Sequence, residues 1–126
     1  MGISETYPMA KNYTPKRRDI IWLDFEPTQG QEIGKYRPAL VLSSVEYNKI
    51  NGLLICCPIS TSIRGALTEV PVRINHTNSV IATTLVQTLS WRSRHAKYQG
   101  KVDEDTFHQV LRRVIPLIGG ETYLTP

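Results

Sequence analysis

Short apolar runs, separated by turns rich in proline, glycine and asparagine, follow one another along most of this chain. No other feature limits the possible fold as strongly. The clearest runs are IIWLDF at 20–25, ALVLSS at 39–44 and GLLICCPIS at 52–60. Each is short and rich in strand-forming residues, so each predicts a largely buried β-strand. TEVPVRI at 68–74 alternates polar and apolar residues and predicts a further strand, with Pro71 at an edge or a bulge.

The segments between these runs complete a pattern of strands and turns. VIATTLVQTLSW at 80–91 predicts one or two more strands. Residues 48–52 and 76–79 hold turn-forming residues, and 61–67 form a polar connection. Many short strands with short connections predict a mostly antiparallel sheet.

The C-terminal part has a different period. In DEDTFHQVLRRVIPLIGG, at 103–120, apolar residues recur at offsets of three and four, which indicates an amphipathic helix. Asp103 is in position to cap the helix, Pro116 to kink its last turn, and Gly119 and Gly120 to end it. Strands followed by one such helix predict a small antiparallel β-barrel, with the helix covering one face or joining a partner.

Length and composition predict one domain with a modest core. The chain has 126 residues, of which 40% are hydrophobic. We expect a flexible N-terminal arm at 1–16, the barrel domain at 17–120 and a C-terminal tail at 121–126. The net charge of +4 and the pI of about 9.2 permit an acidic partner such as a nucleic acid, without requiring one.

Cofactor and membrane motifs have no support in the sequence. Cys56 and Cys57 are adjacent, which disfavours an ordinary structural disulfide and gives no metal-ligand spacing. We expect both to be reduced, half-buried strand residues of a cytoplasmic protein. The histidines show no ligand spacing, and no nucleotide-binding motif occurs, so we expect neither metal nor cofactor. No segment predicts a signal peptide or a membrane span.

GQEIGKYRP, at 30–38, holds the densest group of reactive side chains. Glu32 supplies a possible base, Lys35 and Arg37 supply positive charge, and Tyr36 can stack on a nucleobase or donate a hydrogen bond. Pro38 favours an extended backbone at Arg37, which helps to hold the guanidinium at the start of a strand. On spacing alone, a solvated hairpin loop is the better interpretation.

Two further groups combine cations with polar or aromatic side chains. SWRSR, at 90–94, indicates either a nucleic-acid face or a strand with Trp91 in the core and its arginines in water. The second group, in the connection that follows the third apolar run, offers hydroxyls and a cation that could bind a phosphate. Its alternative interpretation is an ordinary serine-rich turn, which is common. This second group consists of Ser60, Thr61, Ser62 and Arg64.

Taken together, these segments resemble the MazF/PemK family of toxin ribonucleases. The family's order runs from about Arg17 to Gly119, and its most specific block is GxE followed by RPALVLS. The matching segments are DIIWLDFEPTQGQEIGKYRPALVLS, YN, CPISTSIRG, EVPV and SWRSR. The resemblance implies an SH3-like barrel with a C-terminal helix, acting as a homodimer. It also implies metal-free, sequence-specific cleavage of single-stranded RNA, and neutralisation by an antitoxin whose acidic, disordered tail lies in the RNA groove.

The resemblance also implies roles for individual residues. Arg37 matches the arginine of the family's RP motif, to which phosphate stabilisation and proton donation are assigned. Glu32 matches a loop carboxylate implicated in some members, and Ser60 and Thr61 lie where the family has phosphate-contacting hydroxyls. Tyr36 stands where some relatives have histidine. We therefore predict Arg37, Glu32 and Thr61 as catalytic, and as RNA-binding Lys35, Tyr36, Ser60, Ser62, Arg64, Thr84, Gln87, Arg92 and Arg94.

One departure from the family pattern leaves alternatives open. Members commonly carry an Asp-Gln or Glu-Gln pair on the strand before the WR segment, and here that pair falls on Thr84 and Leu85. A shifted register would align Gln87 but still leave Val86 in place of the acid. The chain is then either a ribonuclease that relies on Glu32 and Arg37, or a weak or inactive homologue that binds RNA or antitoxin. A topoisomerase poison on the same fold is a less favoured alternative.

Overall fold

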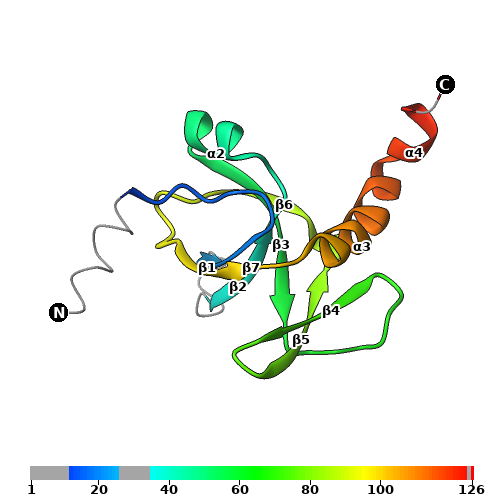
Figure 1. Ribbon diagram of the computed structural model, residues 1–126, viewed down its shortest axis with the longest axis horizontal. Helices are drawn as coiled ribbons and strands as arrows, with labels where there is room; N and C mark the ends of the chain where they lie inside the picture. The colour runs from blue at the N-terminus through cyan, green and yellow to red at the C-terminus, as the bar shows by residue number, and fades with distance from the viewer. Residues whose placement is uncertain (1–11, 26–34, 125) are drawn as a thin grey trace, which may run out of the picture.

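The computed structural model describes residues 12–25, 35–124 and 126. Strands dominate it, and helical segments interrupt or follow them (Figure 1). In chain order the elements are β1 Asp19–Phe25, β2 Lys35–Val41, α2 Val45–Asn51, β3 Leu53–Ser60, β4 Glu69–Ile74, β5 Thr77–Ala82, the 3-10 helix η1 Thr83–Leu85, β6 Gln87–Ser90, β7 Lys97–Lys101, α3 Glu104–Val114, the 3-10 helix η2 Ile115–Ile118 and α4 Gly120–Tyr123.

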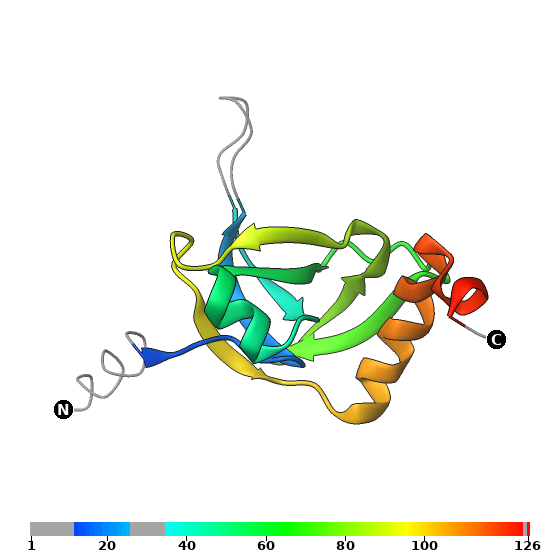
Figure 2. The same cartoon turned by 90° about the horizontal axis from the view of Figure 1, so that it is seen from above.

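The strands form one curled antiparallel sheet, in the order β4-β5-β3-β2-β1-β7, with β6 paired to β3 outside this path (Figure 2). The strand β3 is central because it pairs with β2, β5 and β6. β4 lies at one end of the order and carries Pro71, as predicted, since an edge position tolerates a missing N–H donor. The predicted small antiparallel barrel with a C-terminal helix is confirmed, in the form of a half-barrel.

Two hydrophobic clusters lie on opposite faces of the sheet. The inner cluster is centred on β1, β2 and β3 and includes Leu23, Cys56 and Trp91. The outer cluster joins the other face to the β4–β5 hairpin and α3, and includes Cys57 and Phe107. Alternation along a strand explains how adjacent cysteines enter different clusters. Both cysteines are reduced, as expected, but both are fully buried rather than half-buried, because β3 is covered on both sides.

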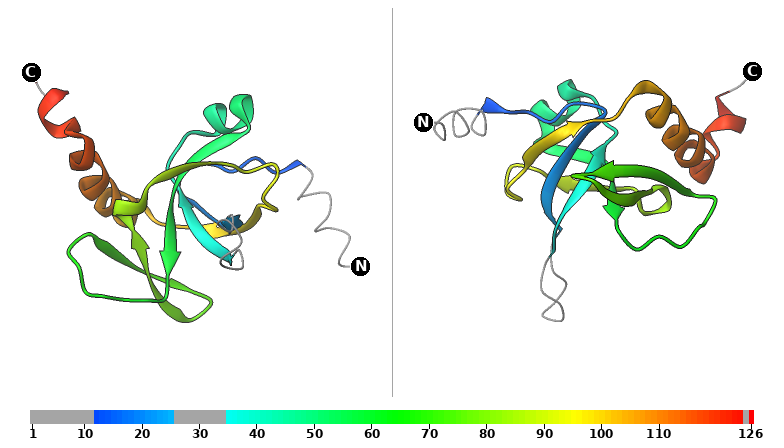
Figure 3. Two further views of the ribbon diagram at one scale, coloured as in Figure 1. Left: turned by 180° about the vertical axis from the view of Figure 1, so that it is seen from behind. Right: turned by 60° about the horizontal axis from the view of Figure 1, so that its bottom comes forward.

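The C-terminal helix follows its sequence signals closely. The Asp103 side chain caps α3 by accepting a hydrogen bond from the Thr106 N–H, and this contact lowers the pKa of the Asp103 carboxyl. The chain changes to the 3-10 helix η2 at Ile115, one residue before Pro116, and Gly119 adopts the left-handed conformation that ends η2. Gly120, also expected to end the helix, instead begins α4. Beyond α3, η2 and α4 extend away from the sheet (Figure 3). Neither these helices nor any other described helix is long and apolar enough to cross a membrane.

Several local predictions differ from the structure. The turn predicted at 76–79 lies at Asn75 and His76, because β5 begins at Thr77. Residues 48–52 are not a turn, because Ser44 caps a helix, α2, that buries Asn48 and ends at a left-handed Gly52. SWRSR does not continue as a strand, since β6 ends at Ser90 and a turn follows, although Trp91 is buried as expected. The polar segment KYQGK forms β7, an edge strand on β1 that was not predicted from the sequence.

The described part of the expected N-terminal arm packs on the sheet. Pro15 is fully buried. Tyr13 Oη donates a hydrogen bond to the carboxylate of Asp19, which is itself buried and paired with Lys101 Nζ at 2.8 Å. Burial, together with this carboxylate, raises the pKa of Tyr13. These contacts fix residues 13–16 against the start of β1.

Candidate nucleic-acid interface

Arg37 lies at the end of β2 that leads out of the β1–β2 hairpin, opposite Leu23 of β1. The side chain is half-buried, and its guanidinium carbon lies 5.8 Å from the centre of the Phe25 ring. Its Nε is fully buried and has no hydrogen-bond partner among the residues that the structure describes. A buried donor without a partner is costly, and an anion would satisfy it.

The pairing of β2 with β3 ends two residues before Arg37. It runs from Val41–Cys56 to Ala39–Pro58, and Ser60, two residues beyond Pro58, pairs with Val80 of β5. From this register we expect Ser60 to lie on the same face of the sheet as Arg37. Ser60 Oγ accepts a hydrogen bond from the Ser62 N–H at 2.9 Å. Thr61 follows the last residue of β3 and is exposed, so Ser60 is the last of the two hydroxyl residues that the strand itself orients.

A second guanidinium lies at the same end of β1. Arg94 Nη1 donates to the carbonyl of Asp24 at 3.0 Å, and the Asp24 N–H donates to the carbonyl of Arg94 at 2.9 Å. Arg94 Nε is also buried without a partner among the described residues. Burial raises the pKa of the Cys56 thiol to about 12, and the Arg94 charge opposes this rise.

The opposite face of the same strand ends carries a polar and aromatic cluster. Tyr36 pairs with Asp24 across β1 and β2 and stacks on Trp22, with ring centres 5.7 Å apart. Tyr36 Oη donates to the carbonyl of His95, and His95 Nδ1 lies 2.7 Å from Asp24 Oδ2. Partial burial and the Asp24 carboxylate both raise the pKa of Tyr36. Sequence reasoning predicted Tyr36 but neither Asp24 nor His95, because no spacing signal links residues so far apart in the chain.

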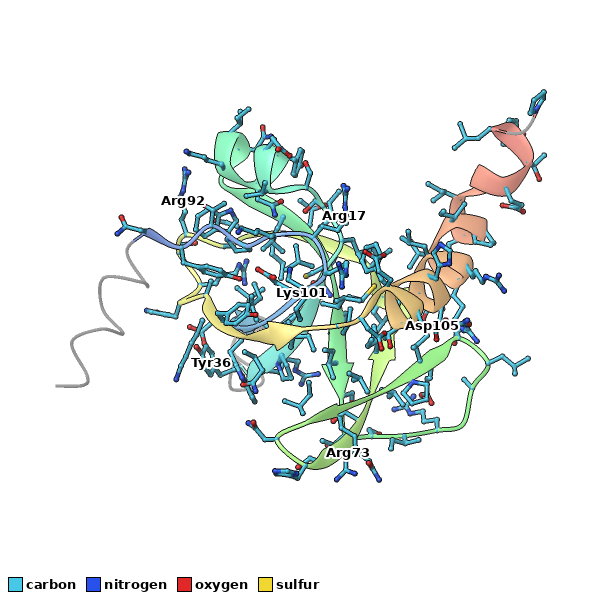
Figure 4. The ribbon with its side chains drawn as sticks, in the orientation of Figure 1. Arg17, Tyr36, Arg73, Arg92, Lys101 and Asp105 are labelled. Carbon is cyan, nitrogen blue, oxygen red and sulfur yellow. The ribbon has the colours of Figure 1, made fainter. Side chains whose placement is uncertain are left out.

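The structure separates Arg92 from this group. Arg92 Nη2 donates to the carbonyl of Lys49 at 2.8 Å, and its guanidinium lies 5.0 Å from the centre of the Trp91 ring. Figure 4 shows Arg92 beside α2 and Tyr36 toward the ends of β1 and β2. Arg92 thus fastens the turn after β6 to α2.

The other predicted contacts occupy exposed connections. Arg64 lies in the segment between β3 and β4, which is organised by Glu69: its carboxylate accepts hydrogen bonds from the backbone N–H groups of Arg64 and Gly65. Ser62 is exposed in the same segment. The structure does not bring Arg64 into contact with Arg37.

Thr84 does not lie on a strand. Thr84 and Leu85 form part of η1, between β5 and β6, and both are exposed. Gln87 begins β6, and its side chain donates to the carbonyl of Leu85. The positions that carry the family's acidic pair therefore present a hydroxyl and an apolar side chain to solvent.

Glu32 and the Lys35 side chain lie outside the described residues, although the backbone of Lys35 begins β2. Within the described part of the chain, no group of three or more His, Cys, Asp or Glu side chains is arranged to hold a metal ion. The candidate interface combines arginines, hydroxyls and aromatic rings with the Asp24 carboxylate and the His95 imidazole.

The sequence profile of one family matches residues 16–118 of this chain, and that family is described as the PemK-like, MazF-like toxins of type II toxin–antitoxin systems. The chain belongs to the PemK/MazF toxin family. The matched residues include every strand and α3, and so cover both faces of the β1–β2 end.

Curated and solved members of the PemK/MazF family agree with this assignment. The endoribonuclease toxin MazF of Escherichia coli strain K12 is 34% identical over 111 residues, covering 88% of this chain and 100% of the relative. A crystal structure of MazF from Deinococcus radiodurans is 33% identical, with a TM-score of 0.77 over 86% of this chain and 99% of that one. A MazE–MazF structure from the same organism is 34% identical, with a TM-score of 0.78 over 86% and 98%. Endoribonuclease activity is therefore a property of the family to which this chain belongs.

Proposed function

We propose that this chain is the toxin of a type II toxin–antitoxin system and cleaves single-stranded RNA at specific sequences without a metal ion, acting in the cytoplasm. Family membership supports the class of activity, and the match to the endoribonuclease from E. coli covers the full length of that protein. The observation that carries the proposal is the buried Arg37 Nε, which has no partner among the described residues.

The reaction needs charge stabilisation above all. The RNA 2′-hydroxyl attacks the adjacent phosphorus, the O2′–P bond forms and the P–O5′ bond breaks, leaving a 2′,3′-cyclic phosphate and a 5′-hydroxyl. Negative charge grows on the phosphoryl oxygens during this step, and preorganised donors stabilise it. Arg37 is suited to this task because a guanidinium presents several donors in a fixed fork. Ser60 Oγ offers a second contact to the same phosphate.

Proton transfer requires a base for the 2′-hydroxyl and an acid for the leaving 5′-oxygen. Glu32 remains our proposed base, and Arg37 our proposed donor to the leaving group. Thr84 lacks an ionisable group, so we assign the proton transfers to Glu32 and Arg37. Thr61 stays a proposed contact, although the register of β3 favours Ser60 for the position nearest Arg37.

We further propose a homodimer and an antitoxin partner with an acidic tail. Apolar side chains are exposed along η2: Leu117 is 46% exposed and Ile118 is 83% exposed. An exposed apolar surface of this kind suits a contact with a second copy. Structural similarity to the MazE–MazF complex from D. radiodurans supports the antitoxin, and the basic groups at the β1–β2 end suit an acidic tail.

The decisive experiment incubates the purified protein with a long single-stranded RNA in EDTA and maps the ends of the fragments. We expect a few short cleavage sequences, cyclic phosphate at one end and 5′-hydroxyl at the other. Cleavage that stops on adding EDTA would contradict the metal-free mechanism. The exposed Thr84 favours one second candidate, a protein that binds RNA or antitoxin without cutting. RNA binding without cleavage, together with cleavage gained in a Thr84→Asp, Leu85→Gln double variant, would support that candidate instead.

A further inference from the structure

We propose that Asp24, Tyr36 and His95 form a subsite for a single unpaired guanine, next to the phosphate held by Arg37. This inference rests on the proposed function, because it names the base that the RNA-binding surface selects. The three residues come from β1, β2 and the turn before β7, and they meet at the ends of those strands.

The alternation of side chains along β2 separates this subsite from the reacting phosphate. Tyr36 and Arg37 are consecutive strand residues, so their side chains lie on opposite faces of the sheet. A phosphate bound at Arg37 therefore cannot also be the group that contacts Tyr36. A neighbouring nucleoside of the same RNA strand is the part that can reach the Tyr36 face.

Tyr36 supplies a surface on which a base can stack. Its ring is 44% exposed and is supported from behind by Trp22 at 5.7 Å, while its hydroxyl is fixed to the His95 carbonyl at 2.9 Å. The ring is therefore held in one orientation before any ligand arrives. Stacking on an aromatic side chain stabilises an unpaired base of any type and does not by itself select one.

The Asp24 carboxylate selects which base binds. The side chain is 46% exposed on a chain with a net positive charge, and an ionised carboxylate only accepts hydrogen bonds. It repels the phosphates of an RNA strand, so the groups that it can bind there are the ribose hydroxyls and the N–H donors of a base. Guanine has two adjacent base donors, N1–H and the N2 amino group. It therefore matches Oδ1 together with the lone pair of Oδ2 that does not face His95.

His95 positions the carboxylate. Its Nδ1 lies 2.7 Å from Asp24 Oδ2, and its backbone adopts the left-handed conformation, with φ of 54°, that non-glycine residues rarely take. The Tyr36 hydroxyl and the Asp24 carboxylate together hold this conformation. An imidazole that is 80% exposed adds little to folding through one surface contact, so the arrangement suits ligand binding better than stability.

The test replaces single atoms of the RNA. The preferred sequence is first obtained by mapping cleaved ends, and by selecting binders from a random RNA pool in parallel. Short RNAs of that sequence, carrying 2′-deoxyribose at the cleaved position to prevent attack, are then prepared with guanine or with inosine, which lacks the N2 amino group. We expect one guanine beside the cleaved phosphate, and a roughly tenfold loss of affinity for inosine there.

Substitutions in the protein identify the group that reads this base. Asp24→Asn should remove the preference for guanine over inosine at that position alone, and His95→Ala should weaken it. His76→Ala, in the β4–β5 turn, is the matched control and should leave the preference unchanged. An unchanged preference in Asp24→Asn, with the RNA still cut, would overturn this inference and leave the proposed function standing. RNA that is neither cut nor bound by the natural protein would overturn both.

Discussion

Arg37 and Arg92 are both arginines that the sequence assigns to RNA, yet the fold uses them differently. Arg92 donates to the Lys49 carbonyl and covers the Trp91 ring, so its guanidinium already serves the packing of α2. Arg37 keeps a buried Nε without a partner in the described residues, at the mouth of the barrel. The difference teaches that residue type gives candidates for a phosphate contact, whereas a buried donor without a partner, as in Arg37, is the reason to propose one of them.

Arg37→Ala should give the largest effect. We expect the rate of RNA cleavage to fall by at least about 100-fold, because one charge-stabilising group is lost. The melting temperature, followed by circular dichroism, should change little, since the side chain makes no hydrogen bond through Nε among the described residues. Arg37→Lys should recover part of the rate, because it keeps the charge but not the fork. Full activity in Arg37→Ala would remove this residue from the mechanism.

Ser60→Ala and Thr61→Ala should separate the two hydroxyls. We expect roughly tenfold slower cleavage for Ser60→Ala, the size of one hydrogen bond to a charged group, and a smaller change for Thr61→Ala. Ser60→Thr should keep most of the rate because the hydroxyl remains. Initial rates on one mapped RNA site provide the comparison. A larger loss in Thr61→Ala would show that the β2–β3 register does not govern the contact.

Arg92→Ala should lower stability and leave the cleavage rate nearly unchanged, whereas Arg37→Ala should do the opposite. We expect Arg92→Ala to lower the free energy of unfolding by about 1 kcal/mol, since one hydrogen bond and one exposed cation–π contact disappear. Cleavage at saturating RNA should remain close to that of the natural protein. Urea denaturation measures the first quantity and initial rates the second. Cleavage that falls as far as in Arg37→Ala would place both arginines on the RNA.

The salt dependence of RNA affinity should show the smallest effect, but it compares Arg37 with Arg92 most directly. A protein contact that neutralises one phosphate of single-stranded RNA contributes about 0.7 to the slope of log affinity against log salt. Arg37→Ala should reduce the slope by that amount, and Arg92→Ala should leave it unchanged. Fluorescence anisotropy with an uncleavable RNA between 50 and 200 mM salt, a range in which such slopes are about linear, measures both. Equal slopes in the two variants would contradict the comparison.

Sequence periodicity predicted the parts of the fold that depend on apolar patterns. The strands around Ile20, Val41 and Leu54 and the helix capped by Asp103 were confirmed. The strand β7, KYQGK, was not predicted because an edge strand needs only backbone pairing with β1 and carries no apolar pattern. The helix α2 was not predicted because Asn48 and Gly52 are residue types that favour turns. Here Asn48 is a buried polar residue of the helix and Gly52 ends it.

The candidate site was predicted only where its residues are close in sequence. Tyr36 and Arg37 stand in one segment with the RP motif, and they were found together. Asp24 and His95 come together only because the turn after β6 runs alongside β1, which is tertiary information. The choice between Ser60 and Thr61 likewise depends on the register of β2 and β3, which no local pattern encodes.

The adjacent cysteines of β3 have a consequence for how this protein unfolds. Cys56 belongs to the inner cluster and Cys57 to the outer one, so a single strand serves as a wall of both. Neither hydrophobic cluster can unfold while the other holds β3 in place. The inner and outer clusters therefore form one cooperative unit. Burial raises the pKa of both thiols to about 12, so neither reacts readily in the folded state. Neighbouring thiols on opposite faces should therefore become reactive together, in one global event.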